Sequence, residues 1–315
     1  MKKKILGIGN AIVDIFAHVD HKFLKENNLV KSSMKLINED EFQQLKNKIK
    51  LEKTIAGGSV ANSMAAIAYL KGDASFIGKI NSDQLGQLYK KGLNEINVKF
   101  LYNEKKESIA TGTCIILITP DSERTMCTYL GVSSQLSAND LNEDQIRDKE
   151  LIFLEGYLWD KGESEKMFTQ AIYLAKKKNI KVAMTLSDKF CVTRHKADFN
   201  NLLKKDLDIL IGNENEIIEL TGQKNLLSSV NQLKELNKLI VITKGELGSL
   251  AINNGQIINC DSVKVDKVLD LTGAGDFFAA GFLKEYLDNS EIKKCLSTGS
   301  TMASKIIQKI GARLE

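Results

Sequence analysis

Short apolar strands alternate regularly with helices through the second half of the 315-residue chain. The alternation opens with a strand at 151–154, a helix at 164–178 and a strand at 181–186, and it continues to a last helix at 297–310. Such a pattern favours a mainly parallel sheet with helices on both faces. We therefore predict a three-layer α/β/α domain, large enough to be stable without a disulfide or a structural metal.

Two β-rich stretches interrupt this pattern, and neither contains a helix that could cover it. We expect them to pair with each other as a small second sheet. The predicted organisation is a large α/β domain of residues 1–14, 39–97 and 131–315, with a small β lid of residues 15–38 and 98–130.

The charge balance is weakly basic, with 44 Lys and Arg against 40 Asp and Glu. Only four of the basic residues are arginines, the residue best suited to phosphate and base contacts, so we do not expect a nucleic-acid partner. Five cysteines without a Cys-x-x-Cys pair predict neither a disulfide framework nor a zinc site. No apolar run reaches 18 residues, so we expect no membrane span and a cytoplasmic protein.

A glycine-rich turn, Asp-Leu-Thr-Gly-Ala-Gly-Asp at 270–276, leads directly into an apolar helix. The first N–H groups of a helix lack internal partners and favour an anion, so this turn could cradle a phosphate. Asp276 would repel such a ligand unless it served a purpose, such as taking a proton from an attacking hydroxyl. The alternative is an ordinary carboxylate that stabilises a helix N-terminus.

A second glycine motif, Gly-Gly-Ser-Val-Ala-Asn-Ser at 57–63, lies far upstream. The two motifs, in this order and at this separation, resemble the signatures of the PfkB/ribokinase family of carbohydrate and nucleoside kinases. The resemblance covers essentially the whole chain and implies a ribokinase-like fold: an α/β/α domain with a mainly parallel sheet, plus a small β-sheet lid. The chain departs from the family pattern at Leu271, where threonine is usual.

The resemblance implies a role for each matching residue near the reaction centre. Asp276 would be the general base, and the backbone N–H groups of Gly273, Ala274 and Gly275 would stabilise the transferring phosphoryl group. The acceptor would be bound by Asn10, Asp14, Gly57, Gly58 and Asn62. A self-capping turn is the alternative for Asn10 and Asp14.

For the second substrate, the resemblance implies ATP and Mg²⁺. The nucleotide would lie along Asn213, Thr243, Gly245, Gly248, Thr272, Gly299 and Ala303, while Glu216 would hold Mg²⁺ through water. The alternatives are a helix capping box at Asn213 and Glu216, and plain helix packing at Gly299 and Ala303. The family also has a monovalent cation site near Asp270 and Thr272. Arg124, on the lid, would lie near the phosphates or in solvent.

Four segments, 10–14, 123–131, 155–159 and 187–192, resemble bacterial adenosine-kinase-like members of the family. We therefore expect phosphorylation of a nucleoside at a primary hydroxyl, adenosine 5′-OH first, with a sugar kinase as one alternative and a non-catalytic nucleotide-binding protein as another. A base needs an apolar slot. Its expected walls are Ile12, Phe16, Tyr129, Leu130, Tyr157 and Phe190. In such proteins the lid is either a simple cover on a monomer or a homodimer surface, and both remain open.

Overall fold

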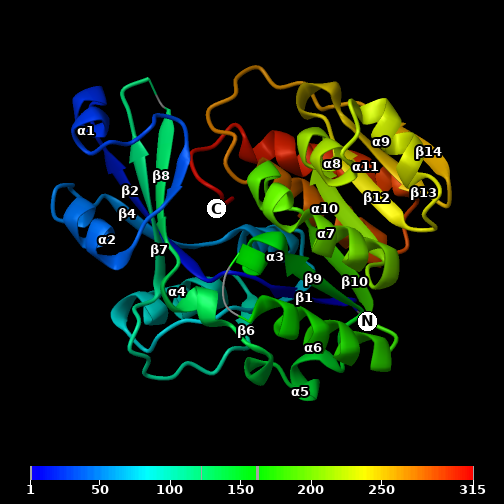
Figure 1. The fold of residues 1–315 in the computed structure, drawn as a ribbon, viewed down its shortest axis with the longest axis horizontal. Coiled ribbons are helices and arrows are strands. Elements are labelled where there is room, and N and C mark those ends of the chain that lie inside the picture. The colour runs from blue at the N-terminus through cyan, green and yellow to red at the C-terminus, as the bar shows by residue number, and fades with distance from the viewer. Residues whose placement is uncertain (1, 122, 161–162, 315) are drawn as a thin grey trace.

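The computed structural model describes residues 2–121, 123–160 and 163–314. Its larger sheet has nine strands and runs through the middle of the large domain (Figure 1). The strands are parallel except for a C-terminal hairpin at one edge. In spatial order they are β14 (Gln256–Cys260), β13 (Ser249–Asn253), β12 (Leu239–Thr243), β11 (Ile209–Asn213), β10 (Lys181–Thr185), β9 (Leu151–Glu155), β1 (Lys4–Ile8), β5 (Asp73–Ile77) and β6 (Val98–Phe100).

Helices cover both faces of this sheet, as the strand–helix alternation predicted. One layer contains α3 (Ser59–Tyr69), α10 (Ala274–Leu287) and α11 (Ile292–Ile306), in which α10 packs against both α3 and α11. The other layer contains α6 (Ser164–Lys177), α7 (Lys189–Lys205), α8 (Glu214–Thr221) and α9 (Leu226–Leu233). The short α5 (Glu143–Ile146) packs on α6, and α4 (Gln84–Glu95) lies beside β6.

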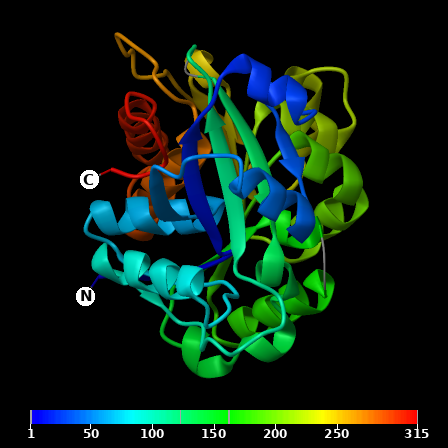
Figure 2. The same ribbon diagram turned by 90° about the vertical axis from the view of Figure 1, so that its left-hand side faces the viewer.

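The second sheet has five strands and forms the lid. Their order is β3 (Met34–Leu36), β8 (Arg124–Tyr129), β7 (Gly112–Ile118), β2 (Ile12–His18) and β4 (Lys53–Gly57). Two helices, α1 (His21–Glu26) and α2 (Glu39–Lys46), lie over its outer face (Figure 2). Because side chains alternate along a strand, β2 turns Val13 and Ile15 toward these helices and Ile12 and Asp14 toward the large domain.

The structure differs from the expected organisation in the following places. Residues 39–46, expected in the large domain, form α2, which packs on β8 of the lid, and residues 53–57, also expected there, form β4 and pair with β2. Residues 98–100, expected in the lid, form β6 and extend the large sheet beyond β5. The stretch 15–38, expected to hold only strands, contains α1, whose first turn is capped by Asp20. Within the described chain, no helix is long and apolar enough to cross a membrane.

Candidate active site

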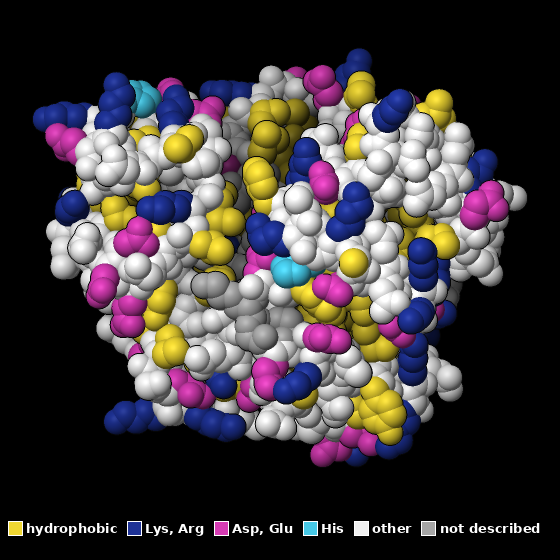
Figure 3. Space-filling model, in the orientation of Figure 1, with side chains coloured by type: hydrophobic (Ala, Val, Ile, Leu, Met, Phe, Trp, Pro, Cys, Tyr) yellow, Lys and Arg dark blue, Asp and Glu magenta, His cyan; other side chains and the backbone are white. Residues whose placement is uncertain are grey.

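Two cavities meet at the glycine-rich turn before α10. The sheet cavity, about 600 Å³, lies between the lid and the carboxyl ends of the large sheet, and the helix cavity, about 860 Å³, lies beside α10, α11 and β12. Both are lined by Thr243, Leu271, Ala274 and Gly275. Hydrophobic side chains line the hollow between the two lobes (Figure 3). A group bound at the turn would therefore be reachable from both cavities.

The turn presents unused backbone donors to these cavities. Gly273, with φ +80°, is the N-cap of α10, and the N–H groups of Gly273, Gly275 and Asp276 have no acceptor within the described chain. The expected donor Ala274 differs, because its N–H already bonds the Leu271 carbonyl at 3.1 Å. Free N–H groups at a helix N-terminus make this turn suitable for an anion.

Asp276, in the first turn of α10, lies at the boundary of the sheet cavity with its carboxylate fixed by α3. Its Oδ1 accepts from Ser59 Oγ at 2.7 Å, and its Oδ2 accepts from Asn62 Nδ2 at 2.9 Å. Burial raises the pKa of Asp276 to about 6, although these two hydrogen bonds and the Arg313 guanidinium oppose that rise. The carboxylate is thus ionised at neutral pH but basic enough to accept a proton.

Asp14 enters the same cavity from β2, and its position depends on Gly57. In the β2–β4 ladder Asp14 lies opposite Ile55, and a Cβ on Gly57 would fall 2.2 Å from the Asp14 carboxylate. The next residue, Gly58, has φ +95°, and its missing Cβ leaves room for the Asn10 carbonyl. Burial raises the pKa of Asp14 to about 7, while Arg313 lowers it. The predicted group Asn10, Asp14, Gly57, Gly58 and Asn62 is brought together.

Glu155, at the end of β9, belongs to this group although the sequence analysis missed it. It is buried and accepts from the Asn10 N–H and side-chain amide, both at 3.2 Å, and from the Val60 N–H at 3.0 Å. Burial raises its pKa to about 7. Glu155 thereby ties the β1–β2 connection to the start of α3. Its place at the carboxyl end of a predicted strand was the only signal available.

Asn213 and Glu216 form the capping box that the sequence left as an alternative to magnesium binding. Asn213 Oδ1 accepts from the Glu216 N–H at 3.0 Å, and the Glu216 carboxylate accepts from the Asn213 N–H at 2.9 Å and amide at 2.6 Å. Both residues also line the sheet cavity. Each carboxylate oxygen keeps a lone pair beyond these bonds, so this pair fits a magnesium ion held through water.

Most of the residues expected to bind the nucleotide line the helix cavity, namely Thr243, Gly245, Gly248 and Ala303. Thr272 lines the sheet cavity instead. Gly299 lines neither, because it lies at the contact of α11 with α10, where a Cβ would come within 2.9 Å of the Phe278 carbonyl. Its neighbour Ser300 and the Phe278 ring face the cavity in its place.

Arg124, at the start of β8, connects the lid to the glycine-rich turn. Its guanidinium pairs with Asp270 at 2.7 Å and donates to Thr272 Oγ1 at 3.4 Å, and its side chain is only 9% exposed, so it is not a solvated turn residue. Asp270 also accepts from the N–H groups of Thr272 and Gly311. The guanidinium therefore already supplies a positive charge beside the Asp270 carboxylate.

The walls of the sheet cavity agree only partly with those expected. Ile12, Leu130 and Tyr157 line it, but Phe16 and Tyr129 do not, and Phe190 is 74% exposed. Tyr129 stacks on Phe42 beneath α2 instead. The remaining apolar wall comes from lid residues that the sequence could not separate from core, which are Met34, Leu36, Cys114, Ile116 and Met126.

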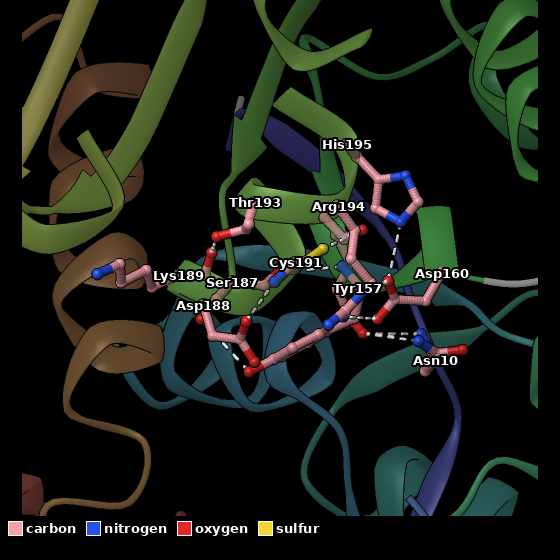
Figure 4. A network of polar contacts seen from close by, with 12 residues as sticks. Asn10, Tyr157, Asp160, Ser187, Asp188, Lys189, Cys191, Thr193, Arg194 and His195 are labelled. Atoms are coloured by element: carbon pink, nitrogen blue, oxygen red, sulfur yellow. Dashed lines mark hydrogen bonds and ion pairs between the residues drawn. The ribbon is translucent and has the colours of Figure 1, made fainter. Parts of the chain in front are cut away.

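The opposite wall is polar. Asp160 accepts from Arg194 Nε at 2.8 Å and Nη2 at 2.6 Å, and contacts His195 Nε2 at 2.9 Å. Figure 4 shows this network beside Tyr157 and Ser187, both of which line the sheet cavity. A helical irregularity at His195 within α7 brings the two basic side chains to the same carboxylate. The cavity is therefore lined by apolar lid residues and, on the side of the large domain, by residues that include the polar Asp160 and Ser187.

Free N–H groups at a helix N-terminus, a carboxylate beside them and two adjoining cavities are the features expected of a phosphotransferase site. The family model described as pfkB family carbohydrate kinase matches residues 26–315, and the chain belongs to that family. It is a nucleoside or sugar kinase with a ribokinase-like fold.

Relatives of known identity extend this result. Adenosine kinase 2 of Arabidopsis thaliana is 25% identical over 98% of this chain and 94% of its own length. Guanosine-inosine kinase of Escherichia coli (strain K12) is 30% identical over 78% of this chain, which spans 58% of that protein. The crystal structure of adenosine kinase from Sinorhizobium meliloti superposes with a TM-score of 0.92 at 34% identity, covering 100% of this chain and 96% of the other.

Proposed function

We propose that this kinase transfers the γ-phosphoryl group of ATP to the 5′-hydroxyl of adenosine. The observation that carries the proposal is the position of Asp276, which lines the sheet cavity and directly follows Gly275, a residue that lines both cavities. ATP in the helix cavity would bring its γ-phosphate to the N-terminus of α10. A nucleoside in the sheet cavity would place its primary hydroxyl between that phosphate and the Asp276 carboxylate.

In the proposed reaction, Asp276 accepts the proton of the acceptor hydroxyl as its oxygen attacks the γ-phosphorus. The new O–P bond forms while the bond from phosphorus to the bridging oxygen breaks, and ADP leaves with that electron pair. The free N–H groups of Gly273, Gly275 and Asp276 would bind the oxygens of the transferring group. Magnesium, held through water by Glu216, would neutralise phosphate charge when bound.

The two walls of the sheet cavity support a nucleoside over a simple sugar. Asp14 and Asn62 offer polar groups for ribose hydroxyls, whereas Ile116, Met126 and Leu130 offer an apolar surface that suits a base. A single sugar would leave that apolar surface uncovered. The similarity to adenosine kinases and to a guanosine-inosine kinase supports a purine nucleoside.

The test is an ADP-release assay with ATP and magnesium over adenosine, guanosine, inosine, ribose and fructose. We expect the highest kcat/KM with adenosine. The matched control ligand is 5′-deoxyadenosine, which keeps the base and lacks the acceptor hydroxyl, so it should inhibit competitively without turnover. Turnover of ribose or fructose without any nucleoside would refute the proposal.

A further inference from the structure

The C-terminal tail returns from α11 to the catalytic end of the large sheet. Gly311 donates its N–H to the Asp270 carboxylate at 2.8 Å. The buried Ala312 packs beside Gly273, where an added Cβ would lie 2.8 Å from the Ala312 side chain. Figure 1 shows the C-terminus between the lid sheet and the helices of the large domain. The tail is thus fixed against the turn that precedes Asp276.

This anchoring places Arg313 against Asn62, a residue that lines the sheet cavity. Its Nη1 donates to Asn62 Oδ1, and its Nη2 donates to the Ala56 carbonyl at 2.6 Å. Asn62 belongs to α3, and Ala56 belongs to the lid strand β4. One guanidinium therefore joins the tail, the large domain and the lid at a single point.

We propose that Arg313 is a positioning residue for phosphoryl transfer, which acts on the base Asp276 through Asn62. A side-chain amide has one acceptor end and one donor end. With Arg313 on its oxygen, Asn62 must turn its Nδ2 toward Asp276, as observed at 2.9 Å. Without Arg313, the Asn62 amide would lose the anchor on its oxygen and could swing away from the carboxylate, and the base would lose a fixed donor.

The positive charge of Arg313 also supports Asp276 as the base. The titratable and charged groups around Asp276 and Arg313 are Asp14 on β2, Tyr89 on α4, Arg124 on β8 and Glu155 on β9. Three carboxylates thus share this space, and Arg313 lowers the pKa of both Asp14 and Asp276. Its guanidinium favours the ionised base that proton abstraction requires.

The inference rests on the proposed function, since it takes Asp276 as the base. The experiment compares Arg313→Met, which removes the charge at similar length, with Arg313→Lys, which keeps the charge but cannot bridge Asn62 and Ala56. The matched control is Arg147→Met, because Arg147 is 63% exposed and pairs only with the exposed Asp144 within the described chain. For each protein we would measure kcat, KM, the pH profile of kcat/KM, and Tm.

We expect Arg313→Met to lower kcat by about tenfold to a hundredfold. We also expect it to move the acidic limb of the pH profile upward by about half a pH unit or more, because Asp276 then protonates more readily. Arg313→Lys should have a lower kcat than the unmodified enzyme, while the acidic limb of its pH profile stays near its original pH. Arg147→Met should resemble the unmodified protein in every measurement.

An unmoved acidic limb in Arg313→Met would overturn the inference even if the rate fell, since loss of packing alone does not shift a titration. An equal limb shift in Arg313→Lys would overturn it as well. If Arg313→Met does not fold, Arg313→Lys decides the question through its retained limb and reduced kcat. Failure of the proposed function is distinguishable, because the unmodified enzyme would then phosphorylate a sugar and the same variants would be compared on that sugar.

Discussion

Replacing Asp276 with Asn tests the proposed base with little disturbance of the structure. In the native site Ser59 and Asn62 both donate to the carboxylate. An Asn side chain at 276 can keep both contacts: its oxygen accepts from Asn62, and its NH₂ group faces Ser59, whose hydroxyl can turn its proton away and accept. The variant should therefore fold and bind both substrates.

The expected loss of rate follows from the role of the group. A positioned general base contributes about 10²–10⁴ in rate, equivalent to about 3–5 kcal/mol of transition-state stabilisation. The folding stability of Asp276→Asn should rise, whereas its rate falls. Because the folded protein raises the pKa of Asp276 to about 6, it binds the proton more tightly than the unfolded chain does. Stability then falls as pH rises toward 6, and the penalty at pH 7 is at most about 3 kcal/mol.

The assay combines ADP release at saturating substrates with calorimetric titration of a non-hydrolysable ATP analogue. We expect Asp276→Asn to lose at least about a hundredfold in kcat, to keep the affinity for the analogue, and to unfold at a Tm a few degrees higher at pH 7. Asp144→Asn is the matched control, since the Asp144 side chain is 81% exposed and Asp144 lines neither cavity. A kcat within about tenfold of the unmodified enzyme would refute the assignment of Asp276 as base.

Three further predictions concern the same site. The kcat/KM of the unmodified enzyme should decrease as the pH falls below about 6, because protonated Asp276 cannot accept a proton. A flat pH profile from pH 5 to 8 would contradict this. Gly58→Ala should raise the KM of the acceptor about tenfold or more and lower Tm, because its φ is +95° and a Cβ would fall 2.3 Å from the Asn10 carbonyl; unchanged kinetics would contradict the geometry. Arg124→Met should leave the Asp270 carboxylate unpaired and lower kcat/KM, while activity that gained a requirement for potassium would show that a cation can take the guanidinium's place.

Much of the large domain could be predicted because its strands and helices carry strong local signals. The strands expected at 151–154 and 181–186 are β9, observed at Leu151–Glu155, and β10, observed at Lys181–Thr185. The helix expected at 164–178 between them is α6, observed at Ser164–Lys177. The sheet to which each strand belongs was harder to predict, because it depends on pairing partners that are distant in the sequence. The 53–57 segment pairs with β2, which follows directly from β1, and no local pattern shows that pairing.

The site could be predicted wherever a motif glycine marks a backbone that must come close to another group. The apolar walls of the sheet cavity could not be predicted, since Met126 and Ile116 alternate along their lid strands in the same way as core residues do. Glu155 was missed because one carboxylate at a strand end has no pattern of its own. Tyr129 was assigned to the cavity, but the strand alternation turns it to the opposite face of the lid, against Phe42.

Gly273 takes part both in the anion site that the motif predicts and in the contact with the C-terminal tail, which the motif does not predict. Its left-handed φ ends the loop so that α10 begins with free N–H groups, which explains why the motif predicts an anion site. The same missing Cβ also admits Ala312, and a side chain there would push the tail away from the turn. Since Ala312 precedes Arg313, the glycine that opens the anion site also lets the chain end reach Asn62 and, through it, Asp276. The glycine-rich turn and the tail thus form one structural unit, although only the turn carries a recognisable motif.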